Sequence, residues 1–167
     1  FLQATREGEA ALVSAVMDAT EGAKKVIDLF SGAGTFTLPL AAIAEVHAVE
    51  SSEEMLETLD RGWRHATGLK TVTTEARDLY RRPFEPDELK KYDVAVLDPP
   101  RAGAEAQIAT LCASKLKRIV MVSCNPITFA RDSATLIDAG FAADWIDVVD
   151  QFRWSPHVEL VGSFTRT

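Results

Sequence analysis

Short apolar segments that alternate with helical segments are the feature of this sequence that most restricts its fold. The apolar segments have the length of buried strands, and helical spacing, capping residues or glycine stops mark the segments between them. Such alternation is typical of a mostly parallel sheet with helices on both faces. The predicted strands are 26–30, 45–49, 71–74, 92–97 and 118–122, and the predicted helices are 3–19, 35–44, one capped by Ser51 or Ser52, 104–114 and 126–139.

The end of the chain departs from this alternation. Apolar segments 141–149 and 158–164 follow each other with no helical segment between them. We expect them to pair antiparallel, because a parallel pair needs a long crossover connection. The predicted fold class is therefore α/β, with a seven-stranded, mostly parallel sheet, a terminal antiparallel pair and helices on both faces.

The size and composition of the chain fit a single domain. The chain has 167 residues, of which 47% are apolar and 26% are charged. This is enough for one well-covered core and too little for two ordinary ones, so we expect one domain over residues 1–167. No apolar run approaches the roughly 20 residues that cross a bilayer. The chain begins with Phe1 rather than methionine, which indicates a fragment or a processed product.

Two cysteines, Cys112 and Cys124, are present in the whole chain. So few cysteines indicate a reducing, cytoplasmic setting. Cys112 lies among apolar residues of the predicted helix 104–114, where packing is its expected role. Three scattered histidines and two separated cysteines give no zinc or iron–sulfur spacing. We therefore expect neither a metal site nor a membrane partner.

The formal net charge of −7 argues against a chain that holds nucleic acid on its own. Neutralising phosphates normally requires a basic surface. Basic residues are nonetheless concentrated around residues 61–70, 77–82, 90–91 and 115–118. Solvated helix ends and loop tips explain such groups more often than a binding face does.

A glycine-rich loop joins the first predicted strand to its helix, in the pattern Asp28-x-Phe30-x-Gly32-x-Gly34. Gly32 and Gly34 remove Cβ atoms where a ligand would touch the backbone and allow positive φ at little cost. The dinucleotide-binding pattern needs a third small residue where Thr37 stands, so a nicotinamide cofactor is disfavoured. The loop resembles the S-adenosylmethionine loop, and Asp28, Phe30, Gly32 and Gly34 are its candidate cofactor residues. A tight structural turn is the alternative.

Two further acidic residues follow strand ends. Glu50 ends the second predicted strand, where a carboxylate can accept hydrogen bonds from both hydroxyls of a ribose. Asp78 lies just beyond the third strand, where it is a candidate for binding the amino group of an adenine. Each carboxylate has a structural alternative, since Glu50 can cap a helix before Ser51 and Asp78 can cap its own loop.

Two motifs near the ends of the fourth and fifth strands carry residues suited to chemistry. Asp98-Pro99-Pro100-Arg101 fixes an extended loop and withdraws amide donors. It is similar to a loop of amino-group methyltransferases, except that Arg101 stands in place of their stacking aromatic residue, which disfavours an exocyclic amine as the target. Ser123-Cys124-Asn125-Pro126 presents a thiol at the carboxyl edge of the sheet, where ligands bind in open α/β folds.

Together with His157-Val158-Glu159, these two motifs resemble, in order, the RNA uracil-5-methyltransferase family. Phe1-x-Gln3 also resembles the opening of the catalytic domain of that family, although Thr5 stands where asparagine is usual. The resemblance covers essentially the whole chain and implies a Rossmann-like methyltransferase fold, S-adenosylmethionine as cofactor, and uridine in tRNA or rRNA as substrate. It also implies an amino-terminal RNA-binding β-barrel that this chain lacks and that would supply much of the RNA affinity.

The chemistry of uracil explains why a cysteine and an acid are needed. Uracil C5 is a poor nucleophile until a thiolate adds at C6 and generates an enolate. After methylation, a base must remove the C5 proton before the thiol is eliminated. Cys124 is the candidate nucleophile and Glu159 the candidate base, with a pKa that apolar neighbours would raise. A buried small residue is the alternative for Cys124.

The resemblance also suggests roles for residues beside this pair. Asp98 is added to the cofactor-binding candidates, and Gln3, Arg101 and His157 are candidates for contacting the substrate. His157 can equally orient Glu159 or fill space. Two other functions remain open at this point: an RNA cytosine-5-methyltransferase, which shares the cysteine chemistry, and a non-catalytic cofactor- or RNA-binding domain.

Overall fold

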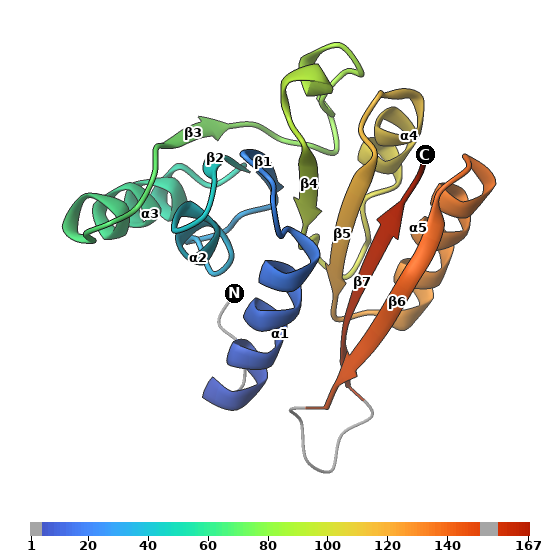
Figure 1. Cartoon of the computed structure of the whole chain (residues 1–167), viewed down its shortest axis with the longest axis horizontal. Coiled ribbons are helices and arrows are strands. Elements are labelled where there is room, and N and C mark those ends of the chain that lie inside the picture. Colours follow the sequence, from blue (N-terminus) through green and yellow to red (C-terminus); the bar gives the residue numbers. More distant parts are fainter. Residues whose placement is uncertain (1–4, 151–156) are drawn as a thin grey trace.

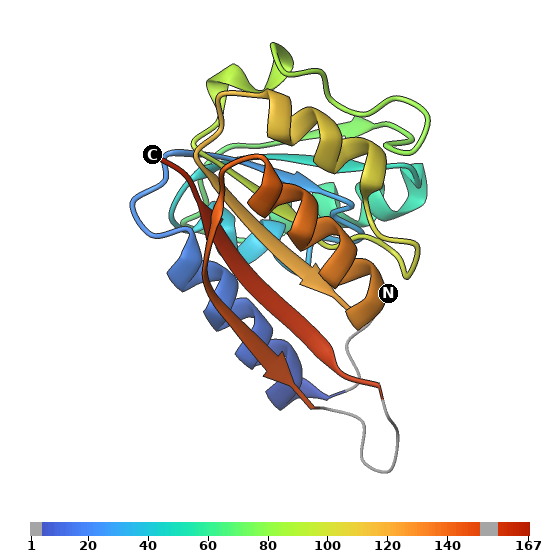
Figure 2. The ribbon, with the colours of Figure 1, turned by 90° about the vertical axis from the view of Figure 1, so that its right-hand side faces the viewer.

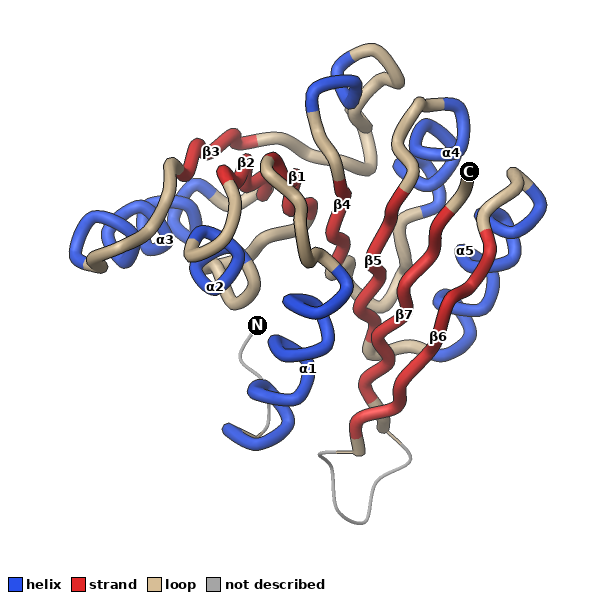
Figure 3. Tube along the Cα trace, viewed as in Figure 1, coloured by secondary structure: helices blue, strands red, loops and turns tan. Residues whose placement is uncertain are grey.

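A single seven-stranded sheet organises the molecule (Figures 1 and 3). The structure is a computed structural model and describes residues 5–150 and 157–167. Its strand order is β3-β2-β1-β4-β5-β7-β6. The strands are β1 (Lys25–Leu29), β2 (Glu45–Glu50), β3 (Val72–Ala76), β4 (Val94–Leu97), β5 (Arg118–Ser123), β6 (Ala142–Val149) and β7 (Glu159–Thr165). The first five are parallel, and β7 runs antiparallel between β5 and β6, which confirms the predicted fold class.

Helices cover both faces of the sheet. Alternate strand residues point to opposite faces, so the sheet separates one core packed against α1 and α2 from another packed against α4 and α5. Figure 2 shows α4 and α5 on one side of the sheet and α1 on the other. The helices are α1 (Arg6–Ala19), α2 (Thr37–Ala41), α3 (Glu53–His65), α4 (Glu105–Ala113) and α5 (Pro126–Asp138), with the 3₁₀ helix η1 at Glu88–Lys91. In the described residues, no helix combines the length and apolarity needed to cross a membrane.

Side-chain caps explain where three of the helices begin. Thr5 accepts a hydrogen bond from the amide of Gly8, Ser52 from that of Met55, and Asn125 from that of Ile127. These residue types satisfy amide groups that the first helical turn leaves without partners. Thr5 therefore caps α1, which starts three residues later than the prediction placed it.

The helix after the glycine-rich loop is shorter than predicted, because α2 covers only Thr37–Ala41 of the expected 35–44. Turn geometry occupies the residues before it, where the amide of Gly34 bonds to the carbonyl of Ser31 and Gly34 has a positive φ of 99°. Pro39 is tolerated because it lies in the first helical turn, where its missing amide costs no hydrogen bond.

Two features of the sheet place residues for function. The order in which strands are added to the sheet reverses between β1 and β4, because β2 and β3 lie on one side of this point and β4 and β5 on the other. The carboxyl ends of strands at such a point border a crevice. The second feature is the register of β5 and β7, whose last pair is Ser123 with Leu160. Cys124, the first residue after β5, and Glu159, the first residue of β7, come next, so both lie at the same edge of the sheet.

Candidate active site

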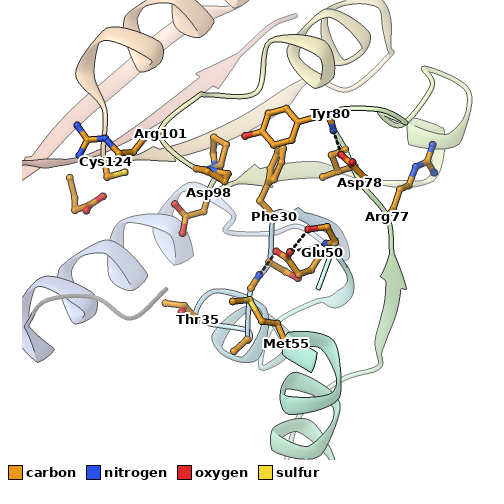
Figure 4. A pocket seen from close by; sticks show the side chains of 18 of the residues that line it. Phe30, Thr35, Glu50, Met55, Arg77, Asp78, Tyr80, Asp98, Arg101 and Cys124 are labelled. Atoms are coloured by element: carbon orange, nitrogen blue, oxygen red, sulfur yellow. Dashed lines mark hydrogen bonds between the residues drawn. The ribbon is translucent and has the colours of Figure 1, made fainter. Parts of the chain in front are cut away.

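A cavity of about 620 Å³ opens at the carboxyl end of the parallel strands (Figure 4). Its walls come from the segments that follow β1, β2, β3, β4 and β5 and from the start of β7. Of the residues predicted for the site, those that line it are Phe30, Gly32, Glu50, Asp78, Asp98, Arg101, Cys124, His157 and Glu159. Gln3 lies outside the described residues.

Asp28 and Gly34 do not line the cavity but shape the loop beneath it. A Cβ on Gly34 would overlap the side chain of Leu59, so this glycine permits close packing against α3. Asp28 is fully buried and accepts a hydrogen bond of 2.5 Å from the Thr37 hydroxyl. Burial raises the pKa of Asp28 to about 7, although the Thr37 hydrogen bond opposes this, and the nearby Glu50 adds to the increase.

Phe30 adopts a left-handed backbone conformation with φ of 63°, which glycine normally occupies. Its ring packs against Tyr80, with 5.5 Å between the ring centroids. These two side chains form an aromatic wall of the cavity (Figure 4). A strained backbone at a cavity wall indicates a functional constraint.

Glu50 joins the glycine-rich loop to the start of α3. Its Oε1 accepts hydrogen bonds from the amides of Ser51 and Ser52, and its Oε2 accepts one of 3.2 Å from the amide of Gly32 (Figure 4). Glu50 therefore also has a structural role, since it fixes the turn before α3, although Ser52 is the residue that caps the helix. Oε2 still has acceptor capacity beyond Gly32, because a carboxylate oxygen has two lone pairs, so both roles are compatible.

Asp78 both fixes its own loop and lines the cavity. Its Oδ1 accepts hydrogen bonds from the amides of Tyr80 and Arg81, and these bonds fix the loop after β3. The same residue lines the cavity, as do Leu79 and Tyr80. This loop therefore presents a carboxylate and an aromatic ring on one wall.

The thiol of Cys124 is half-buried on the opposite side of the cavity from this loop (Figure 4). Burial is the main cause that raises the pKa of the thiol, and the negative charges of Glu159 and Asp98 raise it further. Arg101 opposes them, because its positive charge favours the thiolate. Burial and the local charges together thus determine how readily the sulfur becomes a nucleophile.

Two carboxyl groups accompany the thiol. Glu159 is 1% exposed, its Oε1 has no hydrogen-bond partner among the described residues, and burial raises its pKa. Burial likewise raises the pKa of Asp98 to about 7, with contributions from Glu159 and Asp28. Carboxyl groups with raised pKa values in a cavity are suited to proton transfer near neutral pH.

Comparison with known proteins places this arrangement in a family. A family profile described as tRNA (Uracil-5-)-methyltransferase matches residues 64–166, which is more than half of the chain and includes both Cys124 and Glu159. The chain belongs to the tRNA (uracil-5-)-methyltransferase family. The resemblance drawn from its motifs is therefore confirmed.

Three relatives illustrate the similarity. An uncharacterized RNA methyltransferase of Caulobacter vibrioides is 51% identical over 166 residues, which are 99% of this chain and 40% of the relative. A 23S rRNA (uracil(1939)-C(5))-methyltransferase RlmD of Hahella chejuensis is 39% identical and matches 87% of this chain and 34% of its own length. The crystal structure of Pyrococcus abyssi tRNA (uracil-54, C5)-methyltransferase in complex with S-adenosyl-L-homocysteine has a TM-score of 0.85 and 32% identity, over 99% of this chain and 40% of that one. The chain thus spans about 40% of the length of such family members.

Some cavity residues of this family member were not predicted from its sequence. They are Leu79 and Tyr80, which lie in the loop after β3, and Met55, which lies in α3. Their closeness to Asp78 and Glu50 was the available signal. Arg77, one of the clustered basic residues, also lines the cavity, but its guanidinium pairs with Glu88.

Proposed function

We propose that this chain methylates C5 of a uridine in RNA, with S-adenosylmethionine as methyl donor and a covalent bond between Cys124 and uracil C6. The observation that carries the proposal is the β5–β7 register, because it brings the thiol and the Glu159 carboxylate together at one wall of the cavity. Methyl transfer to RNA is also what the names of the relatives state for those proteins.

The cavity fits S-adenosylmethionine on the observations of this structure. Gly32 has an open position where a Cβ would stand, so a ligand can approach its backbone. The buried hydroxyl of Ser31 has no hydrogen-bond partner among the described residues and lines the cavity. Glu50 and Asp78 would hold the ribose and the adenine, and Asp98 would line the passage toward Cys124. When bound, the cofactor supplies an electrophilic methyl group.

Cys124 begins the reaction as a thiolate. Its sulfur forms a bond to C6, and the electron pair of the C5–C6 double bond moves into the carbonyl at C4 as an enolate. The enolate carbon C5 can then take the methyl group. Arg101, whose charge favours the thiolate, is placed to assist the addition.

Glu159 completes the reaction as the base. Its carboxylate removes the proton from the methylated C5, the C5–C6 double bond re-forms, and the C6–S bond breaks to release Cys124. The buried position of Glu159 raises its pKa, which makes it a stronger base than an exposed glutamate. His157, which lines the same cavity, is proposed to contact the substrate.

The substrate class is tRNA or rRNA, and a cytoplasmic setting remains a prediction. One similar family member is named for tRNA and another for 23S rRNA. The net charge of −7 gives this chain little electrostatic attraction for RNA. We infer that other segments of a full-length protein, like the additional length of its relatives, provide much of the affinity.

A covalent trap tests the function. RNA that contains 5-fluorouridine should form a methylated adduct with the full-length protein in the presence of S-adenosylmethionine, because fluorine cannot leave C5 as a proton does. The adduct should map to Cys124, disappear in Cys124→Ala and persist in the matched control Cys112→Ala. Adducts that survive Cys124→Ala would refute the proposal, and trapping of 5-fluorocytidine RNA instead would indicate a cytosine-5 enzyme.

A further inference from the structure

The loop between β4 and α4, residues 98–104, is tied down by side chains from other elements. This β4–α4 loop contains Asp98 and Arg101, both of which line the cavity. Its own backbone contributes one turn, in which the amide of Gly103 bonds to the carbonyl of Pro100. Three further carbonyl groups of the loop and one amide form hydrogen bonds with side chains. These side chains belong to α5, to the residue that caps α5, and to the loop that follows β3.

The first contact ties Arg101 directly to the turn that carries Cys124. Asn125 Nδ2 donates a hydrogen bond of 2.8 Å to the carbonyl of Arg101. The hydroxyl proton of Thr128 is shared between the carbonyls of Arg101 and Asn125, each 3.2 Å from Oγ1. Asn125 is the neighbour of Cys124 in the chain and caps α5. The backbone of Arg101 is therefore hydrogen-bonded to the same turn that carries the thiol.

The second contact uses a buried charge that the proposed chemistry leaves without a role. Asp132 is 2% exposed, and its Oδ2 accepts a hydrogen bond of 2.8 Å from the amide of Ala104. Its Oδ1 pairs with Arg131, whose Nη2 donates to the carbonyl of Ala102. Gly103 lies between these partners, since a Cβ there would come within 2.5 Å of Arg131 and 2.7 Å of Asp132.

The third contact comes from the opposite side of the loop. The hydroxyl of Tyr80 donates a hydrogen bond of 3.1 Å to the carbonyl of Gly103. Because Tyr80 also packs on Phe30, the loop is fixed between the aromatic wall and α5. A charged residue is rarely buried without a partner, and the residues that pair with Asp132 in the described part of the chain, Ala104 and Arg131, both belong to this fastening.

We propose that Asp132 and Thr128 are positioning residues that hold the β4–α4 loop so that Arg101 stays beside the Cys124 thiol. The inference rests on the proposed function, since it gives Arg101 the task of favouring the thiolate. It goes further by assigning that arrangement to residues of α5 that touch neither substrate nor cofactor. Loosening the loop separates the positive charge of Arg101 from the sulfur, while Glu159, which belongs to β7, keeps its negative influence.

The test measures the thiol rather than methyl transfer. The pH dependence of Cys124 alkylation by iodoacetamide is followed by peptide mass spectrometry in the full-length protein, and Cys112 in the same sample serves as an internal reference. Arg101→Gln should move the midpoint for Cys124 upward by about half a pH unit, which is roughly threefold slower alkylation below the midpoint. Asp132→Ala should produce a shift of the same sign.

A double variant decides whether Asp132 acts through Arg101. In the Arg101→Gln background, Asp132→Ala should add no further shift, and an equal shift in both backgrounds would overturn the proposal. If Asp132→Ala does not fold, Thr128→Val takes its place, because it removes one hydrogen bond to the Arg101 carbonyl at nearly constant volume. Its control is Thr135→Val, because the Thr135 hydroxyl donates to the carbonyl of Arg131 within α5.

The outcome for Thr128→Val is equally decisive. An upward shift of the midpoint that Thr135→Val lacks supports the proposal, and no shift in Thr128→Val refutes it. The measurement is independent of the function proposed above. If the 5-fluorouridine trap fails while the midpoint shifts as expected, the positioning role stands and the uridine chemistry is wrong.

Discussion

Asp28→Asn is expected to stabilise the protein at alkaline pH and to leave its stability nearly unchanged in acid. Asp28 is fully buried and its pKa is raised from 3.8 to about 7, mainly by burial. The folded state therefore binds more protons than the unfolded state between these two values. Stability from this group is present in full below pH 3.8 and is lost as pH rises to about 7. Over about three pH units, at about 1.4 kcal/mol per unit, the loss amounts to about 4 kcal/mol.

Asparagine removes this ionisation and retains an oxygen that can accept the hydrogen bond from Thr37. The free energy of unfolding, measured by urea denaturation with tryptophan fluorescence, should exceed that of the unmutated protein by up to about 4 kcal/mol at pH 8. The gain should shrink steadily as pH is lowered and vanish near pH 4. A difference between the two proteins that is the same at pH 5 and pH 8 would refute the reasoning, because it would show that Asp28 does not titrate between these values.

Three further results are expected. Gly34→Ala should lower the free energy of unfolding by about 1–3 kcal/mol, because alanine is strained at this positive φ and its Cβ would overlap Leu59. In the same thermal melts the control Gly22→Ala should cost less, because a Cβ there meets no neighbouring atom. Equal losses would contradict the packing argument. Glu50→Gln should weaken S-adenosylmethionine binding about 10- to 100-fold, measured by calorimetry, because a hydrogen bond to a charged group contributes about that much to affinity. An unchanged Kd excludes the ribose role. The pKa of Cys124 lies above its ordinary 9.0, so the fraction of thiolate, which is the nucleophile, rises with pH up to at least pH 9. The rate of adduct formation with 5-fluorouridine RNA should therefore increase nearly tenfold per pH unit between pH 7 and 9. A plateau below pH 8 is incompatible with this thiol as the nucleophile.

Local sequence patterns were sufficient to predict the architecture, because each strand and helix is encoded within a few residues. The strands β1, β4 and β5 are apolar runs buried on both faces, and α3 and α5 begin at side-chain caps that can be read directly. The antiparallel end of the sheet followed from a missing helix. The length of α2 was not predicted, because the turn before it depends on how Gly34 packs against α3, a contact distant in sequence.

The candidate site shows the same division between local and distant information. Strand ends could be recognised locally, and the candidate residues at or just after them, Glu50, Asp78, Asp98 and Cys124, line a single cavity. The pairing of Cys124 with Glu159 depends on strand register, which motif order alone does not specify. The hydrogen bond by which Asp132 holds the β4–α4 loop could not be predicted for a similar reason, because Asp132 lies in α5 and its partner Ala104 is distant in sequence.

The mass of the covalent complex formed by Glu159→Gln on ordinary uridine RNA tests the central claim most directly. With S-adenosylmethionine present, the account predicts a methylated adduct that accumulates on Cys124, because addition and methylation proceed while the C5 proton is not removed. Release of methylated RNA by Glu159→Gln at the rate of the unmutated protein, with no adduct on Cys124, would contradict it.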